Sequence, residues 1–201
     1  MKRSIFSGLK RLLPAAPSRR RPRVLYFIVQ YPTFSETYMH EEMQAVAGDV
    51  DFKIITYRAA RFPRRAPFPY EVIRYDDACL VYDPLEKIDR SFGSSTQQLF
   101  LERVGEAIER FQPDVLHAHY FGLTLLLEKL AEDHRIPFTV RTHSMDMLSE
   151  PPEKIAALCQ AANSPWCLRL LAFPAFRNQL IDAGLQPEKV LSCWPVIASS
   201  H

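Results

Sequence analysis

Cysteines and long hydrophobic runs are both scarce in this chain of 201 residues. No run approaches the roughly 18 consecutive apolar residues that a membrane-spanning helix requires. Lys10 and Arg11 interrupt the apolar residues near the N-terminus, which argues against a secretory signal. The four cysteines form no C-x-x-C pair and have no histidines at zinc-like spacing, so we predict reduced, mostly buried thiols in a cytosolic protein. They are Cys79, Cys159, Cys167 and Cys193.

The net charge of +2 conceals an uneven distribution. Eight of the 25 basic residues lie within residues 1–23, which contain no acidic residue, so the remainder has 17 basic and 23 acidic residues. We predict that residues 1–22 form a basic leader and linker outside the folded domain. The leader is either a short interfacial helix, which binds an anionic membrane surface through residues 1–23, or a disordered segment. The acidic body and the lack of an aromatic pattern in the leader argue against nucleic-acid binding.

Residues 24–47 predict a buried strand, a tight loop and an amphipathic helix in succession. Residues 24–29 form an unbroken apolar run rich in β-branched and aromatic side chains, which is typical of a parallel strand covered on both faces. Ser35 stands at a helix N-cap position, and Met39 and Met43 then fall on one helical stripe.

Strands and helices alternate along the rest of the chain. The predicted strands are residues 24–29, 51–57, 71–75, 114–119, 138–142, 166–173 and 189–194. The predicted helices are residues 36–47, 96–111, 122–134, 153–162 and 174–183. Leu99 and Phe100 are expected on the buried side of the second helix. This alternation predicts an α/β fold, a single Rossmann-like domain over residues 23–201 with a parallel sheet and helices on both faces.

Polar residues follow the first predicted strand directly. Ser35, Glu36 and Thr37 open the first helix, so their backbone N–H groups are expected at the carboxyl edge of the sheet, where open α/β folds bind ligands.

Two histidines approach the same edge from another strand. Period-two alternation places His117 and His119 on one face of residues 114–119. No third ligand follows at suitable spacing, so we predict no metal site. We expect His119 to bind a ligand by hydrogen bonds and His117 to be a satisfied histidine of the core.

The next strand delivers four polar side chains to this edge: Arg141, Thr142, His143 and Asp146. A cation, a hydroxyl, an imidazole and a carboxylate together suit a polyhydroxylated ligand, because sugars need paired donors and acceptors. The alternative is a surface turn in which Asp146 caps a following helix.

Three motifs resemble those of one enzyme family. Residues 31–38 (YPTFSETY) resemble the F-P-x-x-S-E-T-F signature of retaining glycosyltransferases of family 4, in the group that includes exopolysaccharide and colanic-acid-type enzymes. Residues 113–122 (PDVLHAHYFG) are similar to that family's P-D-x-I-H-A-H-F-G motif. Residues 136–146 are similar to I-P-x…T-H-G-x-D, with Ser144 in place of the glycine.

The resemblance implies the N-terminal, acceptor-binding half of a GT-B glycosyltransferase. It implies a nucleotide-sugar as co-substrate and no metal or other cofactor. It implies that Ser35 and Thr37 bind near the donor diphosphate through backbone N–H groups, while Glu36 contacts sugar hydroxyls. It places His119, His143 and Asp146 on the acceptor side.

We therefore expect His119 and Glu36 to be catalytic, and the substrate to be bound by Ser35, Thr37, Arg141, Thr142, His143 and Asp146. The expected function is acceptor binding in polysaccharide or glycolipid assembly, on a saccharide or lipid-linked acceptor.

The family's donor-binding C-terminal domain has no counterpart in this sequence, so we expect a separate donor-domain chain as a partner. We expect the protein to be cytoplasmic, at the inner face of the plasma membrane where its leader binds there. The alternatives are a non-catalytic acceptor-binding module and a truncated gene fragment.

Overall fold

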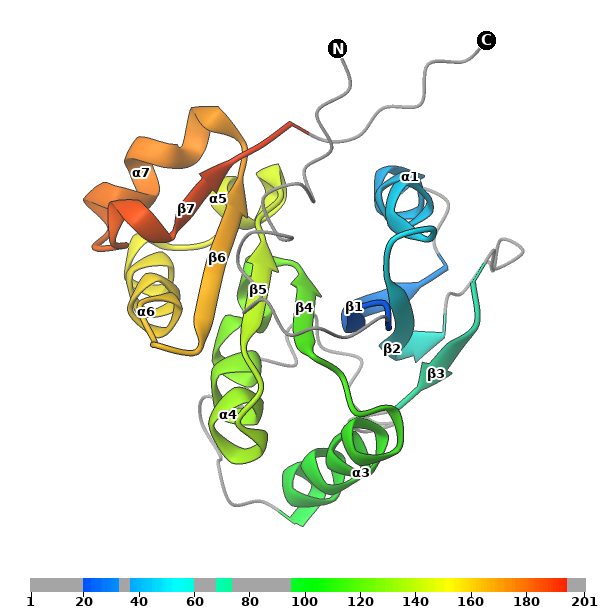
Figure 1. The fold of residues 1–201 in the computed structure, drawn as a ribbon. Helices are drawn as coiled ribbons and strands as arrows, with labels where there is room; N and C mark the ends of the chain where they lie inside the picture. The colour runs from blue at the N-terminus through cyan, green and yellow to red at the C-terminus, as the bar shows by residue number, and fades with distance from the viewer. Residues whose placement is uncertain (1–19, 33–36, 60–67, 74–94, 195–201) are drawn as a thin grey trace, which may run out of the picture.

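The computed structural model describes residues 20–32, 37–59, 68–73 and 95–194. In this part of the chain, seven parallel strands form one sheet in the order β3-β2-β1-β4-β5-β6-β7 (Figure 1). The strands are β1 Arg23–Tyr31, β2 Asp51–Ala59, β3 Tyr70–Val72, β4 Val115–His119, β5 Phe138–Arg141, β6 Cys167–Ala172 and β7 Val190–Ser192. The predicted α/β fold and parallel sheet are confirmed.

Helices follow β1, β3, β4, β5 and β6 along the described chain, as the alternating pattern predicts. The α-helices are α1 Thr37–Val46, α3 Ser95–Phe111, α4 Thr124–His134, α5 Ser144–Ser149, α6 Pro152–Ala162 and α7 Arg177–Asp182. Short 3₁₀ segments are η3 Phe121–Leu123, η4 Pro174–Phe176 and η5 Pro187–Lys189. The sequence pattern missed α5, because six residues are too few to show a helical period.

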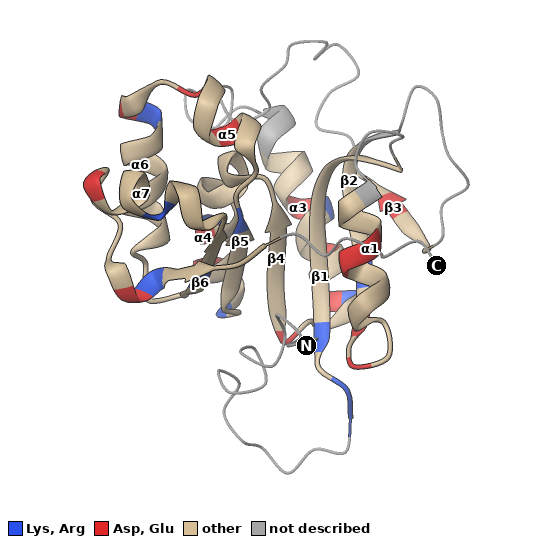
Figure 2. Ribbon diagram, turned by 90° about the horizontal axis from the view of Figure 1, so that it is seen from above, with Lys and Arg blue, Asp and Glu red and all other residues tan. Residues whose placement is uncertain are grey.

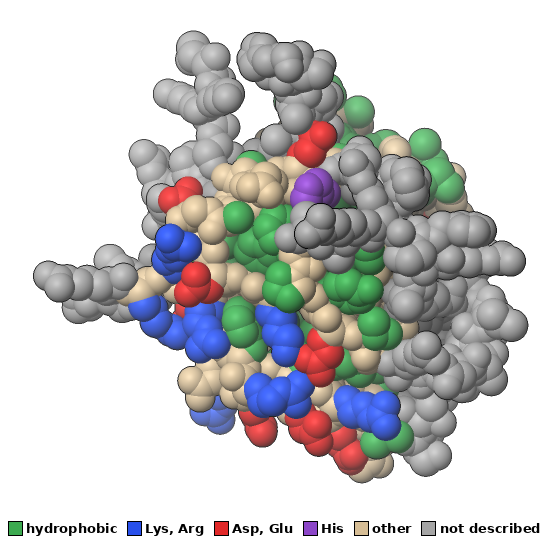
Figure 3. Space-filling model, turned by 90° about the vertical axis from the view of Figure 1, so that its right-hand side faces the viewer, with side chains coloured by type: hydrophobic (Ala, Val, Ile, Leu, Met, Phe, Trp, Pro, Cys, Tyr) green, Lys and Arg blue, Asp and Glu red, His purple; other side chains and the backbone are tan. Residues whose placement is uncertain are grey.

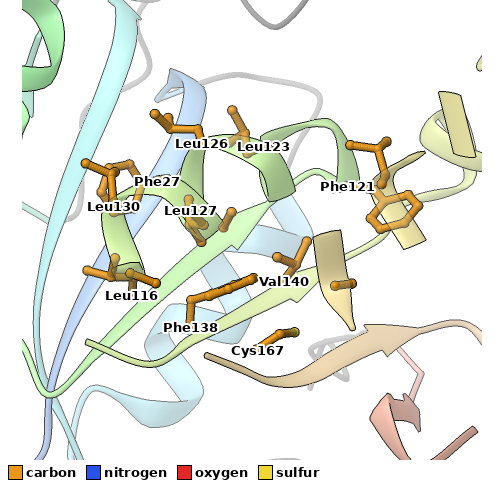
Figure 4. Close-up of a cluster of buried hydrophobic side chains, with 14 of the residues drawn as sticks. Phe27, Leu116, Phe121, Leu123, Leu126, Leu127, Leu130, Phe138, Val140 and Cys167 are labelled. Carbon is orange, nitrogen blue, oxygen red and sulfur yellow. The ribbon is translucent and has the colours of Figure 1, made fainter. Parts of the chain in front are cut away.

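Both faces of β1 are buried, which explains its unbroken apolar run. Leu25 and Phe27 join a large core with side chains of α3, α4 and α6, seen in part in Figure 4. Tyr26 and Ile28 point to the other face and join a smaller core with α1. Helices therefore cover both faces of the sheet, as predicted. Leu99 is 48% exposed, so its predicted place on the buried side of α3 is wrong, whereas Phe100, also predicted there, is buried.

Hydrogen bonds to Asp114 link the start of β1 to the start of β4. One carboxylate oxygen of Asp114 accepts the backbone N–H of Arg23 at 2.8 Å, and the other accepts Nη2 of Arg20 at 2.7 Å. Arg23 also lies 4.5 Å over the ring of Phe111. The aspartate of the P-D motif thus acts at the amino edge of the sheet, opposite the expected ligand edge.

Acidic and basic side chains lie intermingled on the face of the molecule shown in Figure 3. The central strands have few charged residues (Figure 2). One mixed cluster joins β2, β3 and α3, where Glu71 accepts hydrogen bonds from Lys53 and Arg110. Burial acts to raise the pKa of Glu71, but these two cations outweigh it and hold the pKa below its usual value. The cluster fastens the edge strand β3 to its neighbours.

Three of the four cysteines lie in the described structure and are buried and free, as predicted: Cys159, Cys167 and Cys193. Burial raises the pKa of Cys159 to about 11 and that of Cys167 to about 12, so both stay protonated thiols. Cys79 lies outside the described residues.

Candidate functional site

The candidate site lies where β4 and β5 end. His119 is the last residue of β4 and pairs in register with Arg141, the last residue of β5. The two strands remain joined one step further, because the backbone N–H of Tyr120 donates to the carbonyl of Arg141 at 3.0 Å. Thr142 and His143 follow at once, so the predicted meeting of these side chains at the carboxyl edge is confirmed.

A column of rings runs inward from this edge. His143 stacks on His119 with centroids 5.7 Å apart, and His119 stacks on Tyr26 at 5.8 Å. The rings of Tyr38 and Tyr120 contact His143 from outside, at 4.8 and 5.2 Å. We call Tyr26, His119 and His143 the ring column. His143 is its outermost member, at 6% exposed, and His119 lies behind it at 1%.

His117 flanks the ring column and is satisfied. Its ring lies 5.0 Å from that of His119, nearly perpendicular to it. Its Nδ1 is 2.7 Å from Oγ1 of Thr139. The prediction of a satisfied core histidine is confirmed.

Several buried polar atoms of the site have no hydrogen-bond partner within the described residues. They are both ring nitrogens of His119, Nε2 of His143, Oγ1 of Thr142 and Nε of Arg141. An unpaired buried donor or acceptor costs about 1–3 kcal/mol, so such atoms are rare in proteins and mark places where a ligand or water binds. The site therefore has spare hydrogen-bonding capacity.

Burial keeps the histidines uncharged. It lowers the pKa of both His143 and His117 to about 3, and the positive charge of Arg141 adds to the effect. The pKa of His119 is also held far below its usual value, first by burial and then by the nearby rings of His117 and His143 and the positive charge of Arg141. A neutral imidazole has one N–H donor and one nitrogen acceptor. Each ring can thus both give and accept a hydrogen bond, as a hydroxyl group does.

Arg141 is bound to α1 by a buried ion pair. Its Nη2 lies 3.0 Å from Oε1 of Glu42, with the two side chains 3% and 10% exposed. Its Nη1 donates to Sγ of Cys193 at 3.4 Å. Sequence reasoning missed Glu42, although it stands on the apolar stripe of Met39 and Met43, where a carboxylate indicates a buried partner.

Asp146 holds the segment between β5 and α5 in place by hydrogen bonds to the backbone. Its Oδ2 accepts the backbone N–H of His143 at 2.8 Å and that of Phe121 at 3.0 Å, so it joins the start of α5 to the start of η3. Burial raises its pKa to about 6, although these two hydrogen bonds act to lower it. Asp146 thus caps the start of α5, which is the alternative that the sequence left open. Its role in substrate binding stays a prediction.

Tyr120 adopts a backbone conformation that non-glycine residues rarely use. Its φ is 100° at the point where β4 turns into η3. Such strained residues cost about 1–3 kcal/mol and cluster at functional sites. Nothing in the residue type signals this conformation, so sequence reasoning could not find it.

The first predicted loop lies almost wholly outside the described structure. Ser35 and Glu36 are not among the described residues, and Thr37 is described only as the first residue of α1. The roles predicted for these three residues stay predictions, as do the catalytic role of His119 and the binding roles of Arg141, Thr142 and His143.

The described residues contain neither a cluster of metal ligands nor a membrane-spanning helix. Residues 20–32, 37–59, 68–73 and 95–194 hold no group of three or more His, Cys, Asp or Glu side chains arranged for a metal ion. None of the helices described is both long enough and apolar enough to cross a membrane. Residues 1–19 of the predicted leader, residues 1–22, fall outside these ranges.

The parallel sheet and the polar carboxyl edge define a Rossmann-like domain that matches the N-terminal half of GT-B glycosyltransferases. The chain belongs to the glycosyl transferase 4-like domain family, whose model matches residues 35–191. The family resemblance predicted from the motifs is thus confirmed at this level. No curated protein sequence matches the chain.

Solved structures with the same fold share little sequence with this chain. HepE from Anabaena, in complex with UDP and glucose, is 13% identical with a TM-score of 0.62, over 86% of this chain and 44% of that one. Sucrose-phosphate synthase from Thermosynechococcus elongatus is 10% identical with a TM-score of 0.59, over 86% and 48%. The lipopolysaccharide outer core galactosyltransferase WaaB is 9% identical with a TM-score of 0.55, over 84% and 44%. The chain spans less than half the length of each.

Proposed function

We propose that this chain is the acceptor-binding side of a glycosyltransferase that builds a polysaccharide or glycolipid of the exopolysaccharide type from nucleotide-sugars. One observation carries the proposal: the ring column ends at the carboxyl edge of the sheet beside buried polar atoms that lack a partner in the described structure. Family membership supports the reaction class.

The chemistry of this site suits a saccharide. Sugar hydroxyls both donate and accept; the side chain of His143 accepts the backbone N–H of Asp146, so in the neutral ring Nε2 carries the proton and can donate to a sugar oxygen. Tyr38 and Tyr120 flank His143 and are only partly buried, so they offer ring faces to the apolar side of a sugar. In this proposal Thr142 and Arg141 complete the acceptor contacts.

Catalysis in this proposal involves His119 and Glu36 at the acceptor hydroxyl. His119 stands directly behind His143 in the ring column, and its two ring nitrogens lack a partner among the described residues. Ser35 and Thr37 hold the donor phosphates through backbone N–H groups, and Asp146 fixes the loop that carries His143.

The donor half comes from additional polypeptide in this proposal, either in the same protein or as a separate chain. HepE was solved with UDP-glucose, and this chain covers 44% of it. We propose no metal and no cofactor besides the nucleotide-sugar, and a cytoplasmic site of action at an anionic membrane surface contacted by residues 1–23.

Saturation-transfer NMR on the purified chain tests this function. We expect binding of a neutral oligosaccharide and at least tenfold weaker binding by the His143→Ala variant. His134→Ala is a matched control, because His134 lies in the last turn of α4, away from the site. We expect UDP-glucose to bind only when a donor domain is added. Equal saccharide binding by wild type and H143A contradicts the proposal.

A non-catalytic acceptor-binding module is the second candidate. The observation that favours it is the burial of His119 behind His143, since a catalytic group must reach the acceptor. A chain with Glu36→Ala and His119→Ala together distinguishes the two. Saccharide binding by wild type and by this variant, with no sugar transfer by wild type even when the donor half is present, indicates the module. Transfer by wild type that is lost in the variant, while saccharide binding persists, indicates the enzyme.

A further inference from the structure

We propose that Glu42 is a specificity-determining residue that pairs with Arg141 and so makes the acceptor site select an uncharged hexose unit over a hexuronate. The inference rests on the proposed function and deepens it, because it names the chemical class of the sugar in contact with the site.

The geometry of the ion pair carries the proposal. Arg141 Nη2 and Glu42 Oε1 are 3.0 Å apart, and both side chains are almost wholly buried. In such surroundings solvent screens charges weakly, so each partner strongly reduces the field of the other. Glu42 therefore cancels the positive charge at the end of β5.

The remaining surroundings of Arg141 bind its guanidinium without adding charge. Nη1 donates to Sγ of Cys193 at 3.4 Å, and the guanidinium carbon lies 5.8 Å from the ring centre of Phe173. The guanidinium thus contacts the carboxylate of Glu42, the thiol of Cys193 and the ring of Phe173. Only its Nε lacks a partner among the residues that the structure describes.

The other titratable groups at the ring column add no positive charge. His117, His119 and His143 are neutral at physiological pH, because burial lowers their pKa. Asp146 directs Oδ2 to the backbone N–H groups of His143 and Phe121. Within the described residues, the column is therefore a hydrogen-bonding surface without net positive charge.

Such a surface favours hydroxyl groups over carboxylates. The Thr142 hydroxyl can donate to a sugar hydroxyl or accept from it, the neutral ring of His119 has one donor and one acceptor nitrogen, and Nε2 of His143 can donate. A carboxylate accepts only, and leaving water is costly for it unless a cation compensates. In this protein the nearby cation is already compensated by Glu42.

A direct comparison of two probes tests the proposal. Methyl glucoside and its uronate differ only at one carbon, where a hydroxymethyl group is replaced by a carboxylate. Saturation-transfer NMR at low salt is expected to show wild-type binding to the glucoside at least about tenfold tighter than to the glucuronide.

The Glu42→Gln variant removes one charge and keeps the shape of the side chain. We expect it to bind the glucuronide about tenfold tighter than wild type, while binding to the glucoside stays equal or weakens. Damage to the fold weakens both probes together, so it cannot produce this inversion. The Glu41→Gln variant, with the same change one residue earlier on α1, is expected to keep the wild-type preference.

The possible outcomes distinguish the inference about Glu42 from the proposed acceptor-binding function. If wild type binds the glucuronide as well as the glucoside, the inference about Glu42 is wrong while acceptor binding stands. If wild type binds neither probe nor any neutral oligosaccharide, the proposed function is wrong and the inference is wrong with it. If E42Q fails to fold, the wild-type preference alone decides.

Discussion

His143 lies on His119 with the two ring centroids 5.7 Å apart and the ring planes 13° from parallel. The two imidazoles come from the ends of neighbouring strands, so their contact depends on the register of β4 and β5. Both are buried and neutral. Stability and function of the site are thereby linked to pH.

The free energy of unfolding is expected to fall as the pH drops below 6.5. The pKa of His117 and of His143 is about 3 in the folded chain, and that of His119 is also lowered, so the unfolded chain binds more protons. Asp146 opposes this between pH 6 and 3.8, because its pKa is raised to about 6. We expect a net loss on the order of 3 to 5 kcal/mol between pH 7 and 5, measured by urea unfolding.

His143→Gln isolates one contribution to this pH dependence. The variant has no imidazole at position 143, so its unfolding free energy should vary less steeply with pH, by about 1.4 kcal/mol per pH unit below 6.5. An unchanged slope means that His143 is not held neutral in the folded chain.

The carboxylate of Asp146 is expected to stabilise the loop between β5 and α5. Asp146→Ala leaves the N–H groups of His143 and Phe121 without their acceptor, and should cost about 1–2 kcal/mol in urea unfolding. Asp146→Asn keeps an amide oxygen and should cost less. Asp182→Ala, at the end of α7, is the control and is expected to stay within about 0.5 kcal/mol of wild type.

The ion pair of Glu42 and Arg141 should behave as one unit. Removing one partner leaves the other charge buried, so Arg141→Met and Glu42→Met should each cost about 3–5 kcal/mol. The double variant loses both charges and should be less destabilised than the sum of the two, by at least about 1 kcal/mol. A double-mutant cycle in urea measures this coupling. Simple additivity means that the two side chains do not interact.

Strain at Tyr120 predicts an unusual ranking of two small substitutions. Alanine and glycine both remove the ring that contacts His143, but only glycine adopts a φ of 100° easily. Tyr120→Gly should therefore unfold at a higher urea concentration than Tyr120→Ala, by about 1 kcal/mol in free energy. At ordinary helix or strand positions glycine is the less stable of the two, so the usual order contradicts the strained geometry.

The fold could be predicted from sequence because the longer elements have strong local patterns, which the six residues of α5 are too few to show. The apolar run of β1 and the period-two alternation of His117 and His119 each specify a strand and its faces. The prediction that Leu99 is buried is wrong, because apolar residues at helical spacing show which face of a helix is buried but not how wide the buried face is.

The site could be predicted only in part. His119 and His143 follow strand ends, so topology alone brings them to one edge. The pairing of Glu42 with Arg141 depends on how α1 crosses the sheet, and the φ of Tyr120 depends on the turn into η3. Neither is encoded within a short stretch of sequence.

The most direct test is a titration of the purified chain with a neutral oligosaccharide, followed through the imidazole NMR signals. We expect the signals of His143 and His119 to shift together and to saturate at one saccharide concentration, while the signal of His134 on α4 stays in place. Saccharide binding that leaves both site histidines unmoved, or no binding at all, contradicts it.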